Sequence, residues 1–317
     1  MKSFAGHTGR QVLAYTIAVF CLAATPAWGQ SPQPDRPEES GPAGPTEQGS
    51  SPTDGREPEA PQTSHPLMLP VDLLRAQAKQ SLDRITAENG NNETAIVGRF
   101  QLQTEYRALR DTNQVQWRNV ARADLPIGER FLIRTDVPFY NARFTPSDAS
   151  NTWTGGLGDV FIRMGALVYH TPGLKLVVGG DVIFPTAEQD ELGQNKLSLG
   201  PGFAISAPLP QWGIMLFWRF QQIVSVGGDP SQRDVDLTRL RFRFAKPLSP
   251  NWWVHAEPEI RLDWTQKGKT ALLSQFEIGR KLDHHWRLFM RPAVGFSGDN
   301  VPGAYDWFIR FGVRYMF

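Results

Sequence analysis

Three side chains spaced two residues apart form the arrangement in this chain that comes nearest to a reactive site. His255, Glu257 and Glu259 alternate with apolar residues. An imidazole and two carboxylates could bind a divalent metal or share a proton in acid–base catalysis. The same spacing is also what one face of any β-strand presents, because successive side chains point to opposite sides. We therefore favour a network of charges here and expect no metal, no cofactor and no catalytic residue.

A lipid-modifying enzyme of a membrane would need a different pair, a serine activated by a histidine and facing lipid. No His-x-Ser pair lies on any of the strands expected below. The histidines at 7, 65, 170, 284 and 285 fall in an expected leader, linker or turn, which makes them poor candidates for catalysis. We therefore expect a protein that is not an enzyme and keep lipid modification as the least favoured alternative.

Strict alternation of apolar and polar residues dominates the chain after Ala95. Twelve segments, roughly nine to thirteen residues each, repeat the two-residue period that is the side-chain period of a strand. In segment 252–264, for example, Ile260 and Leu262 alternate with Glu259 and Arg261. The last segment, 307–317, has one apolar, aromatic-rich face and resembles the closing strand of bacterial outer-membrane barrels. We expect an all-β fold, a closed antiparallel transmembrane barrel of about twelve strands whose last strand pairs with the first.

Two patterns distinguish a membrane barrel from a soluble sandwich. Connections alternate in length: 170–173 and 282–285 are short, whereas 141–155 and 185–195 are long. Membrane barrels combine short turns at one end with longer loops at the other. Aromatic residues also gather at the two expected ends of the strands, as in the aromatic girdles at the two interfaces of a bilayer. The predicted girdle residues are Trp117, Trp212, Trp252, Trp264, Trp286, Trp307 and Phe317.

Arginines and carboxylates lie on the expected inward face of the barrel. Buried charges need partners, so these residues form either a salt-bridged plug or the lining of a water-filled pore. A barrel of twelve strands is compatible with both, and we favour the pore or gated conduit. The predicted lumen-lining residues are Arg99, Arg118, Arg134, Asp159, Arg163, Asp181, Arg219, Arg241, His255, Glu257, Glu259, Arg261, Arg291 and Arg310.

The first 92 residues differ from the rest of the chain. An apolar run over 12–24 ends at Ala27-Trp28-Gly29, which predicts a secretory signal over residues 1–29. The Pro-, Ser- and Gly-rich residues 30–66 predict a disordered linker, and 67–92 predict a short amphipathic helix ahead of a barrel over 93–317. We expect the outer membrane of a Gram-negative bacterium, with both ends of the mature chain in the periplasm. Cys21 lies in the signal, so the mature chain is expected to lack disulfides.

Composition narrows the partners. A net charge of +1 gives no basis for binding nucleic acid. The expected partners are outer-membrane lipid around the wall, the barrel-assembly machinery acting on the C-terminal strand, and a small-molecule solute of unknown identity.

Three short motifs carry a resemblance to a known family. They are Gly156-Leu157-Gly158-Asp159-Val160, Val182-Ile183-Phe184-Pro185-Thr186 and Leu199-Gly200-Pro201-Gly202. Together they are similar to the meta-pathway phenol-degradation family of outer-membrane proteins, a group of proposed transporters. The resemblance implies uptake of small, often aromatic or hydrophobic, compounds.

Two functions therefore remain open. The first is a passive or gated conduit for small molecules through the outer membrane. The second is a non-conducting structural or interaction barrel, whose outer loops or N-terminal helix bind a partner.

Overall fold

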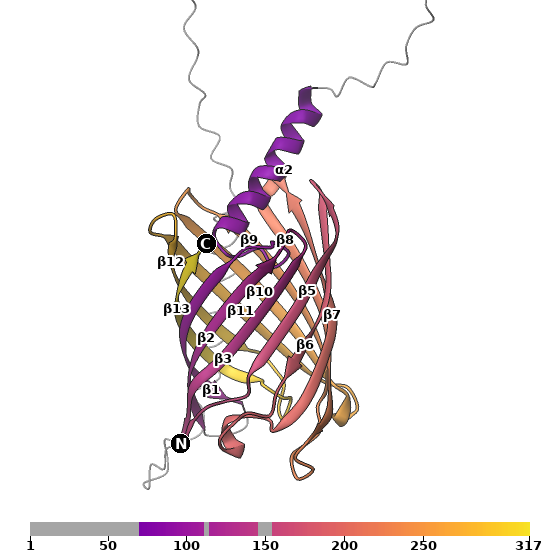
Figure 1. Cartoon of the computed structure of the whole chain (residues 1–317), viewed down its shortest axis with the longest axis vertical. Helices are drawn as coiled ribbons and strands as arrows, with labels where there is room; N and C mark the ends of the chain where they lie inside the picture. Colours follow the sequence, from indigo (N-terminus) through magenta and orange to yellow (C-terminus); the bar gives the residue numbers. More distant parts are fainter. Residues whose placement is uncertain (1–69, 111–113, 145–153) are drawn as a thin grey trace, which may run out of the picture. The chain divides into compact units, whose positions relative to one another are not determined.

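The strands form a closed barrel in the computed structural model, which describes residues 70–110, 114–144 and 154–317 (Figure 1). The expected signal segment 1–29 and linker 30–66 lie outside the described residues. Neighbouring strands pair antiparallel around the wall, and the last strand pairs with the first. The sheet therefore closes on itself, and the predicted seam between the first and last strands is confirmed.

Within the described residues, thirteen strands fill twelve positions in this wall. They are β1 (Arg99–Leu109), β2 (Val115–Ile127), β3 (Phe131–Phe144), β4 (Thr154–Gly156), β5 (Phe161–Thr171), β6 (Leu174–Ile183), β7 (Lys196–Leu209), β8 (Ile214–Gly228), β9 (Asp236–Pro247), β10 (Trp252–Asp263), β11 (Lys269–Lys281), β12 (Trp286–Gly295) and β13 (Tyr305–Met316). The short β4 and the longer β5 both pair with β3, so together they occupy one position. The predicted fold class, a closed antiparallel barrel of about twelve strands, is confirmed.

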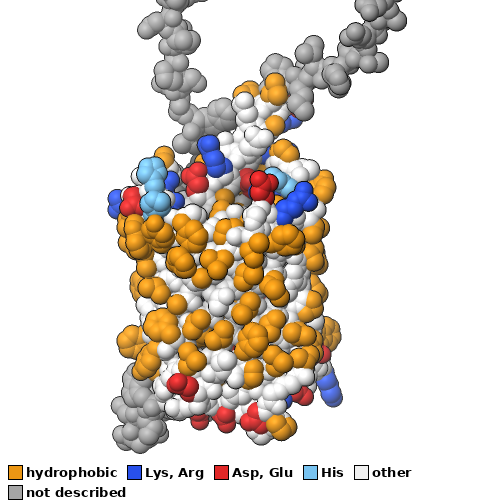
Figure 2. Space-filling view, in the orientation of Figure 1, with side chains coloured by type: hydrophobic (Ala, Val, Ile, Leu, Met, Phe, Trp, Pro, Cys, Tyr) orange, Lys and Arg blue, Asp and Glu red, His pale blue; other side chains and the backbone are white. Residues whose placement is uncertain are grey.

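The two-residue period sorts side chains between the outside and the inside of the wall. In β10, Trp252 is exposed on the outer face, whereas His255 and Glu259 are fully buried. Across the seam, Phe100 of β1 lies opposite Tyr315 of β13, so the outer faces of the two strands are continuous. Figure 2 shows the result, a broad belt of apolar side chains between two zones where charged side chains gather. Such a belt is the surface that lipid tails require.

The two ends of the barrel carry connections of different length. Short turns at 172–173, 248–251 and 282–285 lie at the end where β13 finishes, which we call the short-turn end. Longer segments at 184–195, 229–235 and 296–304 lie at the opposite, long-loop end. The alternation of connection lengths is therefore present in the structure.

Three residues were wrongly placed by the sequence pattern. Trp212 and Trp264, expected in strands, lie in the one-turn helices η2 (Pro210–Trp212) and η3 (Trp264–Gln266). Left-handed residues, Gly213 with φ 62° and Lys267 with φ 58°, end these turns and take the backbone out of the extended conformation. His170, expected in a turn, belongs to the last residues of β5. A third one-turn helix, η1 (Asp190–Leu192), lies in the long 184–195 connection.

A helix, α2 (Pro70–Glu88), precedes the barrel at its short-turn end. Pro70 starts it, where a missing N–H costs nothing, and Gly90 at φ 68° follows its end in the left-handed conformation that favours glycine. Its first turns are exposed, whereas Leu82 and Thr86 near its end are buried. Among the described residues, no helix combines the length and the apolar character needed to cross a bilayer.

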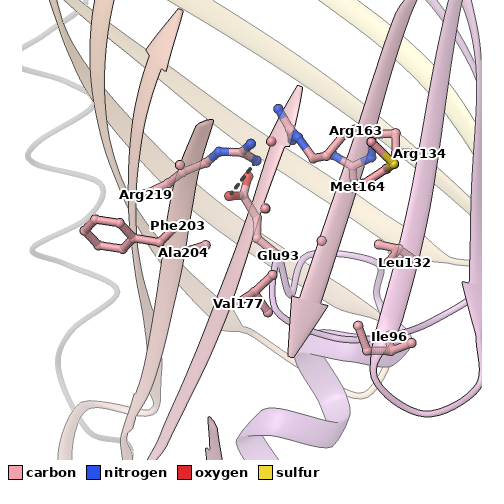
Figure 3. A pocket seen from close by; sticks show the side chains of 14 residues that line it. Glu93, Ile96, Leu132, Arg134, Arg163, Met164, Val177, Phe203, Ala204 and Arg219 are labelled. Atoms are coloured by element: carbon pink, nitrogen blue, oxygen red, sulfur yellow. Dashed lines mark ion pairs between the residues drawn. The ribbon is translucent and has the colours of Figure 1, made fainter. Parts of the chain in front are cut away.

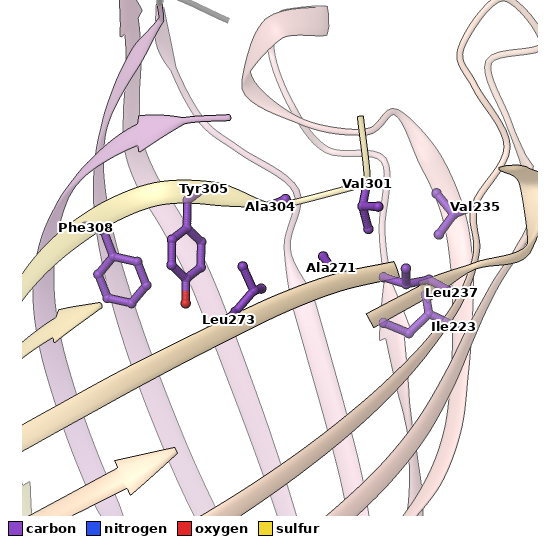
Figure 4. Packing of buried hydrophobic residues seen from close by; sticks show 9 residues of the cluster. All are labelled: Ile223, Val235, Leu237, Ala271, Leu273, Val301, Ala304, Tyr305 and Phe308. Carbon is purple, nitrogen blue, oxygen red and sulfur yellow. The ribbon is translucent and has the colours of Figure 1, made fainter. Parts of the chain in front are cut away.

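The main apolar cluster lies inside the barrel, toward the long-loop end (Figure 4). It joins inward side chains of four strands to residues of two long loops. Its members are Ile223, Val235, Leu237, Ala271, Leu273, Val301, Ala304, Tyr305 and Phe308. The sequence pattern did not indicate this cluster, because the inward face was expected to be lined with charge.

Candidate functional site

A cavity of about 600 Å³ lies inside the barrel, bounded by strands, loops and the chain segment that precedes β1. Its lining includes fourteen arginines and five acidic residues, so guanidinium groups dominate its surface. Ten of the fourteen predicted lumen residues line this cavity. They are Arg99, Arg118, Arg134, Asp159, Arg163, Arg241, Glu257, Arg261, Arg291 and Arg310.

The other four predicted lumen residues lie within the barrel wall's charge network, outside this cavity lining. Asp181, His255 and Glu259 each expose 2% or less of their surface. Arg219 lines a much smaller space of about 40 Å³, which it shares with Glu93. All four positions face inward, but whether they act on a solute stays a prediction.

Paired arginines and carboxylates link neighbouring strands. Arg134 of β3 donates through Nε and Nη2 to both oxygens of Asp124 on β2, at 2.7 and 2.9 Å. Arg163 of β5 holds Asp181 of β6 in the same two-pronged way, at 2.7 and 2.8 Å. Bidentate pairs of this kind fix geometry as well as charge. Because these pairs join adjacent strands, we interpret them as structural contacts that stabilise the barrel wall.

The three residues of β10 that suggested a metal or an acid–base site face separate partners. Glu257 accepts from Arg243 Nε at 2.6 Å. Glu259 accepts from Arg239 Nε at 2.7 Å and from Arg261 Nε at 2.8 Å. Within the described ranges, no three His, Cys, Asp or Glu residues are grouped in a way that could hold a metal ion. These contacts form a charge network.

A second hub of this network lies on β11. Glu277 of β11 accepts from Arg314 at 2.8 and 3.1 Å, from Arg291 at 3.0 Å and from the indole of Trp253 at 3.0 Å. His255 Nδ1 lies 3.7 Å from the same carboxylate. Trp253 points inward although its neighbour Trp252 points outward. The alternation along this strand put Trp252 on the outward face, so Trp253 falls on the inward face, as the structure has it.

The segment 89–95, between α2 and β1, enters the short-turn end of the lumen. Arginines of the wall donate to its main chain: Arg99 to the carbonyl of Gly90 at 2.6 Å and Arg243 to that of Asn91 at 3.1 Å. Thr94 Oγ1 shares a 2.6 Å hydrogen bond with Ser206 Oγ of β7. These contacts make the segment a plug of that end, a role that its polar sequence did not predict.

Glu93 places the one carboxylate of this plug among arginines of the wall. It accepts from Arg243 Nη2 at 2.8 Å, and Arg219 Nη1 lies 4.0 Å from its second oxygen. Arg241 and Arg163 are close enough to act on it electrostatically. Figure 3 shows the Arg219 guanidinium beside the Glu93 carboxylate, with Arg163 across from it.

Loop residues narrow the long-loop end. Val301 and Ala304 are buried in the apolar cluster, and Arg261 Nη1 donates to the carbonyl of Pro302 at 3.0 Å. Asp159, a predicted lumen residue, accepts the backbone N–H groups of Ala187 and Gln194 at 3.2 and 2.5 Å. Asp159 therefore anchors the 184–195 loop as well as facing the cavity.

The seven predicted girdle residues are all exposed on the outside of the barrel, at 40 to 61% of their surface. Trp212, Trp252, Trp286 and Phe317 adjoin the short-turn end, and Trp117, Trp264 and Trp307 adjoin the long-loop end. Their contact with membrane interfaces stays a prediction.

Asp283 fixes the turn before Trp286. The backbone N–H groups of Trp286 and His285 both donate to Asp283 Oδ1 at 2.7 Å. These hydrogen bonds hold the pKa of the Asp283 carboxyl below its usual value, because they stabilise the charged form.

Comparison with known proteins agrees with this architecture. The sequence model of the family described as "Putative MetA-pathway of phenol degradation" matches residues 86–221. No curated protein matches the chain. An outer membrane channel from Pseudomonas putida F1 superposes with a TM-score of 0.51 at 11% identity, over 70% of this chain and 94% of that one. The NanC porin gives a TM-score of 0.50 at 10% identity, over 69% of this chain and 100% of that one.

At such low identity these two structures show a shared fold and nothing finer. The family match begins at residue 86, so it includes the plug and the strands β1 to β7, and it spans all three motifs at 156–160, 182–186 and 199–202. The resemblance expected from those motifs is confirmed, because residues 86–221 match the family's sequence model.

Proposed function

We propose that this protein is a gated conduit for small molecules through the outer membrane. The observation that carries the proposal is the arginine-rich cavity of about 600 Å³ inside a closed barrel. At its short-turn end this cavity meets the plug 89–95, and at its long-loop end it meets the loop 296–304. Both closures are chain segments and not wall strands, so each can move without opening the sheet.

The orientation follows from the lengths of the connections. Membrane barrels of this class have short turns on the periplasmic side and longer loops outside. We therefore place the short-turn end, with α2, the plug and the C-terminus, in the periplasm. The strand β13, with one outward aromatic-rich face, is then the segment that the barrel-assembly machinery would recognise.

The two sides of the cavity suggest the kind of solute. Arginines crowd its middle, whereas Ile223, Leu237 and Phe308 line its long-loop side. A small compound with an apolar or aromatic body could rest against the apolar side. The name of the matching family, which refers to phenol degradation, supports this choice. The proposed role is transport without chemistry, so we propose no enzymatic activity.

A non-conducting barrel is the second candidate, and one observation favours it. Hydrogen bonds and ion pairs hold the plug across the short-turn end of the lumen, as they would in a barrel that only displays loops or presents α2 to a periplasmic partner.

Bilayer recordings separate the two candidates. Purified protein in planar bilayers should show stepwise conductance, and deletion of 30–92 should make open events more frequent, because α2 and the first plug residues are then gone. A folded barrel that conducts in neither form would overturn the conduit. Loss of a co-purifying periplasmic protein on deletion, with permeability unchanged, would favour the interaction barrel.

A further inference from the structure

Two of the arginines around Glu93, Arg219 and Arg241, are incompletely paired. Arg219 lies 3.5 Å from Asp181 and 4.0 Å from Glu93, and Arg241 lies 3.6 Å from Glu257. Nε and Nη2 of Arg241 are buried without a hydrogen-bond partner. The bidentate pairs of the wall, such as Arg134 with Asp124, show what full pairing looks like. We call Arg163, Arg219, Arg241 and Arg243 the arginine cradle. Arg163 and Arg243 are hydrogen-bonded, whereas Arg241 has donors to spare and Arg219 makes only long contacts.

The carboxylate in the cradle comes from the plug and not from the wall. Glu93 lies outside every strand, in a segment held by hydrogen bonds from wall side chains to its main chain. A carboxylate on a separate molecule could make the same contacts with Arg243 and Arg219. Exchange of one carboxylate for another leaves the charge of the lumen unchanged, so it avoids the cost of uncovering buried guanidinium groups.

We propose that the arginine cradle is a carboxylate-binding site that Glu93 occupies in the closed state, and that a small aromatic monocarboxylate displaces Glu93 to loosen the plug. This inference rests on the proposed conduit and names its solute class. The site would couple solute arrival to opening, because the ligand competes with the contact that holds the plug.

The aromatic part of the ligand is assigned from the same cavity. Phe161, Tyr305 and Phe308 line it together with Arg241 and Arg243. The hydroxyl of Tyr305 is buried without a hydrogen-bond partner, so a polar substituent on a bound ring would satisfy it. An arginine side and an aromatic side within one cavity suit an amphipathic anion better than either a sugar or a neutral hydrocarbon.

Binding of 4-fluorobenzoate to the full chain in detergent micelles tests the site directly by fluorine NMR. Glu93→Gln removes the tethered competitor, and we expect it to bind 4-fluorobenzoate about tenfold more tightly than the unsubstituted protein. Glu88→Gln is the matched control, because Glu88 pairs with Lys281 at the edge of the barrel and should leave the affinity unchanged. Adding Arg241→Gln to Glu93→Gln should abolish the gain, whereas Arg280→Gln, an exposed arginine, should preserve it.

4-Fluorobenzamide has the same ring as 4-fluorobenzoate but no charge, so it distinguishes recognition of the carboxylate from recognition of the ring. We expect Glu93→Gln to bind the amide no more tightly than the unsubstituted protein does. Equal affinity of the unsubstituted protein and Glu93→Gln for 4-fluorobenzoate would overturn the inference, as would equal gains for the acid and the amide. Because binding is measured without conductance, a conducting barrel whose affinity ignores Glu93 refutes the cradle and leaves the conduit standing. A barrel that binds as expected but never conducts refutes the conduit alone.

A second measurement uses the unsubstituted chain and does not depend on the folding of a variant. Saturating benzoate should accelerate amide hydrogen exchange in residues 89–95, because the plug loses its ionic anchor. Benzamide at the same concentration should not. Unchanged exchange with bound benzoate would show that the anion binds elsewhere and would overturn the displacement of Glu93.

Discussion

Lys175 of β6 donates a 2.6 Å hydrogen bond to the carboxylate of Asp83, so an ion pair joins the barrel wall to α2 just ahead of the plug. Both side chains are partly buried, which protects the pair from solvent screening. Asn92 Nδ2 donates to Asp83 as well, at 2.9 Å. Asp83 therefore connects three parts of the short-turn end: the helix, the plug and the wall.

Lys175→Met should loosen α2 from the barrel. We expect a cost of about 1 kcal/mol, since the pair is neither fully exposed nor fully buried. Amide hydrogen exchange in the second half of α2 should become about fivefold faster, while the wall strands keep their protection. Arg75→Met is the control, because Arg75 and Asp72 form an exposed pair at 3.9 Å. Equal acceleration in both variants would argue against the anchor.

Gly179→Ala should weaken the pairing of β5 with β6. A Cβ at Gly179 would lie 2.0 Å from the carbonyl oxygen of Met164, which is wall backbone and cannot move aside cheaply. We expect about 1–3 kcal/mol of destabilisation, the usual cost of an overpacked site. Urea unfolding in micelles, followed by the gel mobility shift of folded barrels, measures it.

Gly180→Ala provides the control at the next residue. There the nearest atom to an added Cβ is 3.6 Å away, an ordinary contact. Its unfolding midpoint should match that of the unsubstituted protein. A Gly180→Ala variant as unstable as Gly179→Ala would mean that the close contact with Met164 does not set the cost.

Strict alternation made the wall predictable from the sequence. Where one face of a strand is polar, as with His255 and Glu259 on β10, the period of two identifies the inward face, and the structure buries both residues. Where two neighbours are both apolar, polar residues further along the strand decide. Leu273 has the same parity as Gln275 and Glu277, and the structure exposes Leu272 and buries Leu273 in the internal cluster. The pattern did not indicate that an apolar cluster would form there.

The plug could not be predicted, for a different reason. Glu93 and Arg243 are 150 residues apart, and their contact exists only once the barrel has closed. A local pattern records which face of a strand is buried but not what fills the space that the closed wall encloses. Residues 89–95, rich in asparagine and glycine, therefore looked like the end of a helix and a connection.

Acid should loosen the turn that Asp283 holds. Hydrogen bonds from Trp286 and His285 lower the pKa of this carboxyl in the folded state. Their stabilising effect is therefore fully present at a pH above the pKa of an unfolded aspartate, ~3.9. It is lost as the pH falls through the lower pKa of the folded state. We expect the amides of His285 and Trp286 to lose protection below about pH 4, after correction for the intrinsic exchange rate. Asp283→Asn should flatten this dependence. The same loss of protection in Asp283→Asn would assign the effect to another group.

Val301→Asp should open the long-loop end while leaving the wall intact. Val301 is 4% exposed and packs in the internal apolar cluster, where an unpaired carboxylate would cost about 3–5 kcal/mol if it stayed buried. The loop 296–304 can avoid this cost by leaving the lumen, because it belongs to no strand pair. Single-channel conductance should rise severalfold, and a protease should cut the loop in the folded protein. Val226→Asp is the control, because Val226 lies near the same end and is already exposed. If Val301→Asp left both conductance and cleavage unchanged, the 296–304 loop would not be the closure of this end, and the constriction would have to lie at the plug.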